Sequence, residues 1–178
     1  ANRGAAGDPP ARVRWPPDRS RAKAVRVVVG RHGAITGQAQ RYDLTAADVP
    51  YPANSVFNPG AARIGDETIL LVRVEDLRGI SQLHVARSAD GETGWTFDPE
   101  PLLRADVDRD PEETWGCEDP RLTWLPEREE WAIAYTAYSR RGPLVSLAVT
   151  TDFRHAWRLG PVMPPEDKDA AMFPRRFG

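Results

Sequence analysis

Two adjacent carboxylic acids, followed by a proline and an arginine, form the segment of this sequence with the clearest capacity for chemistry. They are Glu118, Asp119, Pro120 and Arg121, at the edge of an apolar run. A carboxylic acid can give up or take a proton during a reaction, and a guanidinium group can hold an anion. Residues 115–123 therefore predict a site for sugar or phosphate chemistry at the entry of a β-strand.

Other residue types that often carry chemistry are poorly placed for it. The histidines, His32, His84 and His155, lack the spacing of metal ligands, and Cys117 is the single cysteine. We therefore expect neither a metal site nor a catalytic thiol. The glycine-containing segment 30–33 lacks the helix and the Gly-Lys-Ser or Gly-Lys-Thr ending of a phosphate-binding loop, so it is interpreted as a turn.

The composition fits one ordinary core and argues against a nucleic-acid or membrane partner. Of 178 residues, 40% are hydrophobic and 28% are charged, and the formal net charge is -2 at pH 7. No apolar run approaches the roughly 20 residues that span a bilayer. Residues 1–20 also lack the apolar core of a secretory signal. The expected location is therefore the cytoplasm.

The order of apolar runs and turn residues predicts many short strands. Residues 1–23 are rich in proline and charge, which predicts a loosely ordered N-terminal arm. Residues 24–29 are typical of a strand, and residues 45–48 of a short helical turn capped by Thr45. The remainder, residues 24–178, contains frequent prolines and glycines between apolar runs, which favours turns over long helices.

From residue 57 onward the sequence repeats itself. Three pairs of segments correspond in order, namely 58–64 with 118–124, 69–75 with 131–137, and 83–91 with 145–153. Each set leads to a further strand near a tryptophan, so the units run over about 57–110 and 115–162. A third, incomplete unit opens at 166–178. Four short strands in about 50 to 60 residues are typical of a propeller blade.

The predicted fold class is therefore all-β, with about two blades of a β-propeller and the first strand of a third. Regularly spaced turns also fit a β-sandwich, but agreement across three successive strands favours the propeller. Propellers typically have at least four blades. Further chain, or partner copies in a homo-oligomer, is thus expected to complete the ring.

Five ordered segments resemble glycoside hydrolase family 130, which comprises β-mannoside phosphorylases and some β-mannosidases. The segments are residues 57–61, 72–76, 115–121, 135–139 with Gly142 and Pro143, and 164–170 with Phe173 and Pro174. The resemblance covers about residues 55–178 and implies a five-bladed propeller with its active site at the central axis. Members of the family are usually longer, so the resemblance also implies that this chain is the N-terminal part of a catalytic domain.

The resemblance implies that Asp119 is the general acid, which in part of the family relays its proton through a sugar hydroxyl. An inverting glycosidase also needs a carboxylate to activate water. A phosphorylase does not, because phosphate is already an anionic nucleophile and needs cationic groups to hold it. From the residues alone, an aspartate before a proline at a strand entry is also a common turn residue.

Four further residues are expected to bind the ligands, and a fifth to support a sugar ring. The resemblance places Asn58 and Arg73 at positions that contact the mannosyl unit or phosphate, and it places Lys168 and Asp169 on a segment that faces the same axis. We predict phosphate binding by Arg73 and Lys168, and substrate binding by Asn58, Arg73 and Asp169. Trp115, beside the acidic motif, is the best candidate for stacking on a sugar.

Structural roles compete with these functional ones. Arg73 lies inside an apolar strand, where an ion pair with Glu75 or Asp76 would explain it equally well. Glu118 precedes Asp119 in an extended segment, so its side chain is expected on the opposite face, in a structural role.

The predicted function is inverting phosphorolysis of β-mannosyl oligosaccharides, which gives mannose 1-phosphate. Inorganic phosphate would be a co-substrate, and no cofactor is expected. Two alternatives remain open. One is a β-mannosidase of the same family, in which acids that activate water replace the anion-binding cluster. The other is an inactive propeller fragment that binds carbohydrate or associates with itself.

Overall fold

The chain is built of β-strands, which confirms the predicted all-β class. The computed structural model describes residues 25–28, 41–106 and 108–175, and in these ranges it has ten strands and two short 3-10 helices. The expected N-terminal arm, residues 1–23, lies outside the described residues. Neither of the two helices in these ranges is long and apolar enough to cross a membrane.

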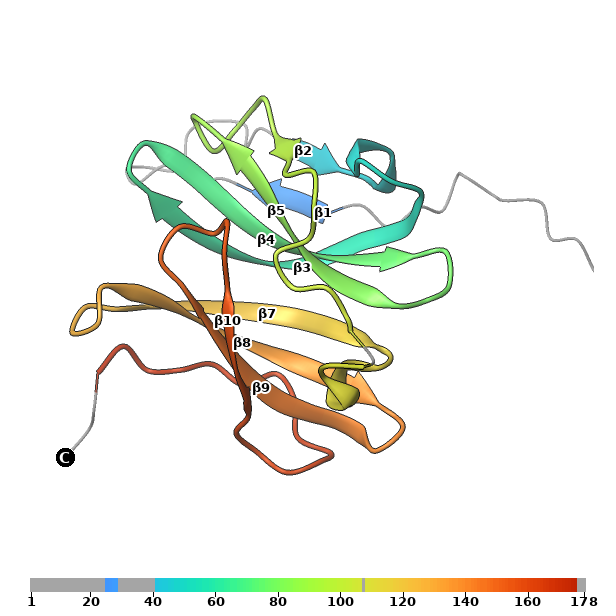
Figure 1. Cartoon of the computed structure of the whole chain (residues 1–178). Coiled ribbons are helices and arrows are strands. Elements are labelled where there is room, and N and C mark those ends of the chain that lie inside the picture. Colours follow the sequence, from blue (N-terminus) through green and yellow to red (C-terminus); the bar gives the residue numbers. More distant parts are fainter. Residues whose placement is uncertain (1–24, 29–40, 107, 176–178) are drawn as a thin grey trace, which may run out of the picture.

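Two four-stranded antiparallel meanders make up most of the described chain, and Figure 1 shows them as two stacked layers. The first meander consists of β3 (Ala53–Ile64), β4 (Glu67–Asp76), β5 (Ser81–Ser88) and β6 (Thr96–Phe97). The second meander consists of β7 (Gly116–Leu125), β8 (Glu130–Ser139), β9 (Gly142–Thr150) and β10 (Trp157–Pro161). The 3-10 helix η3 (Pro111–Glu113) lies in the connection between them.

A small N-terminal part precedes the meanders. The strands β1 (Val25–Val28) and β2 (Arg41–Leu44) pair antiparallel, which confirms the strand expected over 24–29 for residues 25–28. The 3-10 helix η2 (Ala46–Asp48) follows, and its cap is as predicted. The backbone N–H of Thr45 donates to a carboxylate oxygen of Asp48 at 2.8 Å, which closes a capping box.

One apolar core fills the space between the meanders, and a second covers the outer face of the first meander. In β4, Ile69 and Leu71 point into the first core, whereas Leu70 and Val72 point into the second. Because both faces of β4 are covered, the strand is an unbroken apolar run rather than an alternating one. The segment after β2 supplies part of the second core, including Leu44 and Val49.

The two meanders meet at a parallel bridge between Ser81 and Gly116. A Cβ atom on Gly116 would lie 2.8 Å from the backbone nitrogen of Ser81, and Gly116 has a φ of 139°. Any side chain there would push β7 away from β5. Gly116 therefore sets the close approach of the two sheets directly before the acidic motif.

The internal repeat is present, but its alignment moves by one residue in the first strand of each unit. Asn58 and Asp119 share a positive φ, 47° and 49°, and each precedes a proline. Each also lies in a shift of strand register, between Phe57 and Gly60 in one case and after Glu118 in the other. Asn58 is thus equivalent to Asp119 and not to Glu118. Apolar spacing missed this because a bulge accommodates an extra residue.

The same correction applies to the second strands but not to the third. Leu71 pairs across from Gly60, and Ala134 pairs across from Arg121, which makes Leu71 equivalent to Ala134. In the third strands the predicted alignment agrees with the structure, because both turns that follow are built on an aspartate. The Oδ1 atom of Asp90 accepts from the backbone nitrogen three residues later at 2.7 Å, and that of Asp152 does so at 2.9 Å.

The expected first strand of a third blade is not formed. Residues 166–175 contain no strand, because none of the described residues offers them a backbone ladder. The segment nevertheless lies against β7, where the Thr123 hydroxyl donates to the carbonyl oxygen of Met172 at 3.0 Å. Asp169 also has a positive φ, 59°, like Asn58 and Asp119. The third segment thus shares a positive φ at its aspartate but not the strand.

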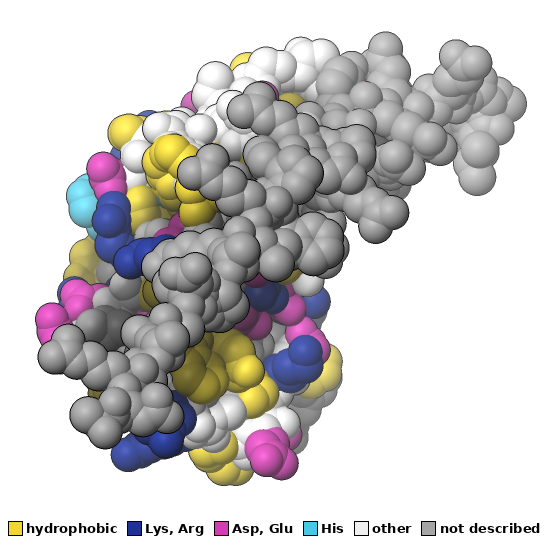
Figure 2. All heavy atoms as spheres, turned by 90° about the vertical axis from the view of Figure 1, so that its right-hand side faces the viewer, with side chains coloured by type: hydrophobic (Ala, Val, Ile, Leu, Met, Phe, Trp, Pro, Cys, Tyr) yellow, Lys and Arg dark blue, Asp and Glu magenta, His cyan; other side chains and the backbone are white. Residues whose placement is uncertain are grey.

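The described surface carries charges of both signs. On the face drawn in Figure 2, the lysine and arginine side chains are interspersed with aspartate and glutamate rather than gathered in one area. This mixture agrees with the near-neutral net charge of the sequence, -2. It gives this face no basic stripe, among the residues described, that would hold a nucleic acid.

His84 makes the stability of the first meander depend on pH. It is fully buried between Tyr51 and Phe97, and burial, together with the charge of Arg104, lowers its pKa to about 4. An unfolded chain binds this proton near its ordinary pKa of about 6.5. Stability is therefore lost as the pH falls from about 6.5 to about 4, by about 3 kcal/mol.

We expect His84→Phe to remove this part of the acid sensitivity, because a phenyl ring packs between the same neighbours and does not titrate. Urea unfolding of both proteins at pH 7.5, 6.0 and 4.5 gives their free energies of unfolding. The contribution of His84 is the difference between the two pH dependences. Parallel losses of stability in both proteins across this range would show that His84 does not set it.

Candidate active site

A bulge in β7 turns both acids of the motif toward one arginine. Asp119 has a φ of 49°, and the register of β7 shifts between Glu118 and Arg121. The regular alternation of side chains holds only in an unbroken strand, so it does not apply at this point. The expectation that Glu118 lies on the opposite face is wrong, because Glu118 and Asp119 both bind Arg73.

The guanidinium group of Arg73 is held by three polar groups. Its Nη1 donates to Asp119 Oδ1 at 3.1 Å and its Nη2 to Glu118 Oε1 at 2.8 Å. Its Nε donates to the Ser81 hydroxyl at 2.8 Å. The ring of Phe57 lies 4.4 Å from the guanidinium carbon, in cation–π contact. Arg73 thereby ties β3, β4, β5 and β7 together at one point.

The alternative role considered for Arg73, an ion pair with Glu75 or Asp76, is not formed, because these acids have other partners. Glu75 accepts a hydrogen bond from Asn54 at 2.6 Å. Asp76 accepts from Arg78 at 2.7 Å. In a strand, Arg73 and Asp76 point to opposite faces, which rules out a direct contact in this register.

Asp119 is fixed through one of its two carboxylate oxygens. Asn58 Nδ2 donates to Oδ1 at 2.9 Å, and Arg73 donates to the same oxygen. Among the described residues, Oδ2 has no hydrogen-bond partner. Asp119 is largely buried, with 9% of its surface exposed. One oxygen of the carboxyl group is thus held by two donors and the other is not, which suits a group that transfers a proton.

Glu118 holds a proton more readily than a free glutamate. Burial raises its pKa, and the charge of Asp119 raises it further. Arg73 and Lys168 act in the opposite direction, but the net shift is upward. The single guanidinium group of Arg73 thus offsets only part of the cost of burying Glu118 beside a second acid.

The residues expected at the start of the third unit lie at the edge of this cluster. Lys168 and Asp169 are about half exposed and form an ion pair at 3.7 Å. Lys168 is close enough to Glu118 to affect its pKa. Neither side chain is rigidly fixed by the described residues around it, in contrast to Arg73.

Two other residues of the motif have distinct positions. Trp115 is 43% exposed and packs edge to face on Tyr138, with ring centroids 5.3 Å apart. It remains available to stack on a ligand. Arg121 Nη1 donates to the carbonyl oxygens of Asp119, at 3.3 Å, and Pro120, at 3.1 Å. Arg121 thus braces the backbone of the bulge.

Sequence reasoning missed three members of this cluster. Ser81 and Phe57 both contact Arg73, and Glu118 shares its guanidinium group. The internal repeat carried a usable signal for Phe57, because with the corrected alignment it is the equivalent of Glu118. No comparable signal existed for Ser81, which reaches the site only because of the bridge to Gly116.

The sequence and the fold both match known carbohydrate-active proteins. The family described as beta-1,4-mannooligosaccharide phosphorylase matches residues 20–177. A curated beta-1,2-mannobiose phosphorylase of Listeria innocua is 31% identical over 101 residues, which are 57% of this chain and 27% of that protein.

Solved structures agree with this match. The complex of beta-1,2-mannobiose phosphorylase from Listeria innocua with beta-1,2-mannobiose is 25% identical, with a TM-score of 0.58 over 70% of this chain and 48% of the other. A glycosyl hydrolase from Bacteroides ovatus is 30% identical, with a TM-score of 0.54 over 60% of this chain and 31% of the other. This chain therefore spans less than half the length of each of these relatives.

Proposed function

Since the chain belongs to glycoside hydrolase family 130, we propose that the protein carries out inverting phosphorolysis of β-mannosides, with Asp119 as the general acid. The observation that carries the proposal is the placement of Asp119. Two donors fix one of its oxygens, and the other lacks a partner among the described residues. Completion of a five-bladed propeller around this site is part of the same proposal.

The reaction needs one proton and one anionic nucleophile. A phosphate oxygen attacks the anomeric carbon, and the bond from that carbon to the leaving sugar breaks. The leaving oxygen keeps the electron pair of the broken bond and takes the proton of Asp119, directly or through a sugar hydroxyl. The products are mannose 1-phosphate of inverted configuration and a shortened saccharide.

The pairing of the two acids argues against Glu118 as the water-activating base of a hydrolase. An inverting hydrolase places its two carboxyl groups about 6.5–9.5 Å apart, so that water fits between substrate and base. Glu118 and Asp119 are adjacent and bind a single guanidinium group, Arg73. Glu118 is thus badly placed to activate water.

Phosphate would bind next to Lys168. Arg73 already forms ion pairs with two acids, so its positive charge is partly neutralised and less available to phosphate. Lys168 is 56% exposed and has one weak pairing among the described residues, to Asp169 at 3.7 Å. An ammonium group in this position is free to reorient toward an anion.

The decisive test is the dependence of β-mannobiose cleavage on phosphate. The chain, and any longer protein that contains it, is incubated with β-mannobiose with and without inorganic phosphate. We expect mannose 1-phosphate only when phosphate is present. Free mannose as the sole product, at equal rates in both arms, would assign a hydrolase instead. Absence of any cleavage by the longer protein would contradict both enzymes and favour a binding module.

A further inference from the structure

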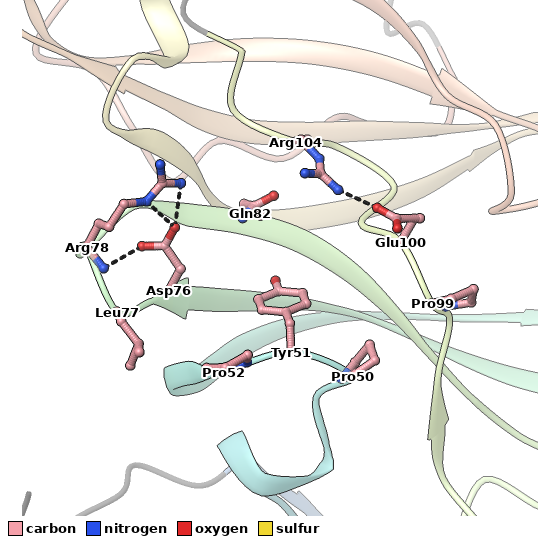
Figure 3. Close-up of a pocket in the computed structure, with 10 residues that line it drawn as sticks. All are labelled: Pro50, Tyr51, Pro52, Asp76, Leu77, Arg78, Gln82, Pro99, Glu100 and Arg104. Atoms are coloured by element: carbon pink, nitrogen blue, oxygen red, sulfur yellow. Dashed lines mark hydrogen bonds and ion pairs between the residues drawn. The ribbon is translucent and has the colours of Figure 1, made fainter.

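A pocket lies on the first meander, next to the last residue of β4 and to Gln82 of β5 (Figure 3). It has a volume of about 430 Å³, which lies within the range of small-molecule sites. Three prolines form part of its wall, and its polar lining consists of Tyr51, Asp76, Arg78, Gln82, Glu100 and Arg104. We propose that this pocket binds a neutral saccharide unit.

The pocket and the candidate active site share one end of the sheet. Gln82 follows Ser81 in β5, and alternating side chains direct the two to opposite faces. Ser81 binds Arg73 in the candidate active site, and Gln82 lines the pocket. Asp76, the last residue of β4, comes three residues after Arg73. A ligand in this pocket would therefore lie one sheet thickness from the reacting group.

Two buried polar atoms give the pocket unmet hydrogen-bonding capacity. The hydroxyl of Tyr51 and Oε1 of Gln82 are shielded from solvent and have no partner among the described residues. Figure 3 shows the Tyr51 hydroxyl directed toward Gln82. A buried polar group without a partner costs about 1–3 kcal/mol. A sugar hydroxyl can donate to the amide oxygen and accept from the phenol, so it would satisfy both once these two side chains turn toward the pocket.

The charges in the pocket cancel, which favours a neutral ligand. Asp76 binds Arg78, with Oδ2 accepting from Nη2 at 2.7 Å, and Glu100 binds Arg104. A phosphate or another anion would have to break these pairs to gain a cation. A polyhydroxyl ligand can instead hydrogen-bond to the paired groups as they stand. Burial and the charge of Asp76 raise the pKa of Tyr51 to about 12, so the phenol stays neutral as well.

A neighbouring pocket extends the site toward the second meander. It has a volume of about 250 Å³, shares Arg78, Gln82 and Arg104 with the first, and continues to Thr114. Thr114 precedes Trp115, the exposed tryptophan of the candidate active site. The two pockets together suit an oligosaccharide longer than a disaccharide. Its identity as a β-mannoside rests on the proposed function.

Binding is tested in Asp119→Asn protein, where turnover does not consume the ligand. Titration with β-mannotriose is followed by calorimetry and by the NMR signals of the Gln82 side-chain amide. We expect a second class of binding site whose ligand shifts these signals. Tyr51→Phe and Gln82→Leu should each weaken that class about fivefold, because each removes one hydrogen bond. Asp66→Asn, in the turn at the other end of the sheet, is the matched control and should have no effect.

The outcomes separate this inference from the proposed function. Saccharide binding at Gln82 without phosphorolysis by the wild-type protein would keep the pocket and reject the enzyme. Phosphorolysis without any saccharide-dependent shift of the Gln82 signals would keep the enzyme and reject the pocket. Inorganic phosphate alone is titrated in parallel, and if it shifts the Gln82 signals more than β-mannotriose does, the pocket is an anion site and the inference is overturned.

Discussion

Asp119→Asn is expected to lower the rate of phosphate-dependent β-mannoside cleavage by about 10²–10⁴-fold, the usual contribution of a positioned general acid. Asparagine keeps an oxygen that can accept from Asn58 and Arg73, as Oδ1 does now at 2.9 Å and 3.1 Å. What it loses is the proton that the leaving oxygen takes. The measurement is the initial rate of mannose 1-phosphate release at saturating phosphate, compared with an unchanged circular-dichroism spectrum.

Glu118→Gln is the matched control, because it removes the same charge from the neighbouring position and keeps a contact with Arg73. Its effect should stay within about tenfold, since Glu118 acts on Asp119 only through Arg73, which both acids bind. An activated substrate with a good leaving group sharpens the comparison, because it needs no proton and should restore most of the Asp119→Asn rate. Equal losses in both variants, unrelieved by that substrate, would show that Asp119 has no special role.

The sequence predicted the members of this cluster better than their mutual geometry. Asn58 and Arg73 both bind Asp119, although the three residues come from three strands. Their place in known motifs identified them, but a β-bulge decided where each side chain points. Because the bulge at Asp119 interrupts the alternation, the side chain of Glu118 points toward Arg73 and not to the opposite face of the strand. A pattern of apolar and polar residues carries no information on a single positive φ, and this is why the error arose.

The repeat shows the same limit at a larger scale. The apolar runs indicate its strands and turns, but the predicted alignment of Asn58 with Glu118 is wrong by one residue. The third unit was predicted from its sequence to begin with a strand, whereas residues 166–175 share the positive φ at Asp169 without a ladder. Turn conformation is local and follows from Asp169 and its neighbours. A strand depends on a hydrogen-bonding partner, which no local pattern can supply.

No sequence pattern predicts the buried charged network that joins the connection between the meanders to the second meander. Glu113 in η3 is 1% exposed and accepts hydrogen bonds from Tyr135 and Cys117. Arg158 in β10 reaches it with Nη2 at 2.9 Å and also donates to the carbonyl oxygen of Arg104 at 2.7 Å. Burial and the charge of Glu113 raise the pKa of Tyr135, so its phenol remains a hydrogen-bond donor at neutral pH.

Arg158→Met should therefore destabilise the protein by about 3–5 kcal/mol, because removal of one partner leaves a buried carboxylate without its counter-charge. Methionine is similar in length, so lost packing contributes little. The free energy of unfolding in urea measures the change. The double variant Glu113→Gln with Arg158→Met should recover more than half of the loss, since it removes the fully buried carboxylate and leaves only Asp110, 3.2 Å from Arg158, with one partner fewer. If the two substitutions instead add, the pair is not coupled, and the connection must be held by its apolar contacts, chiefly Leu103.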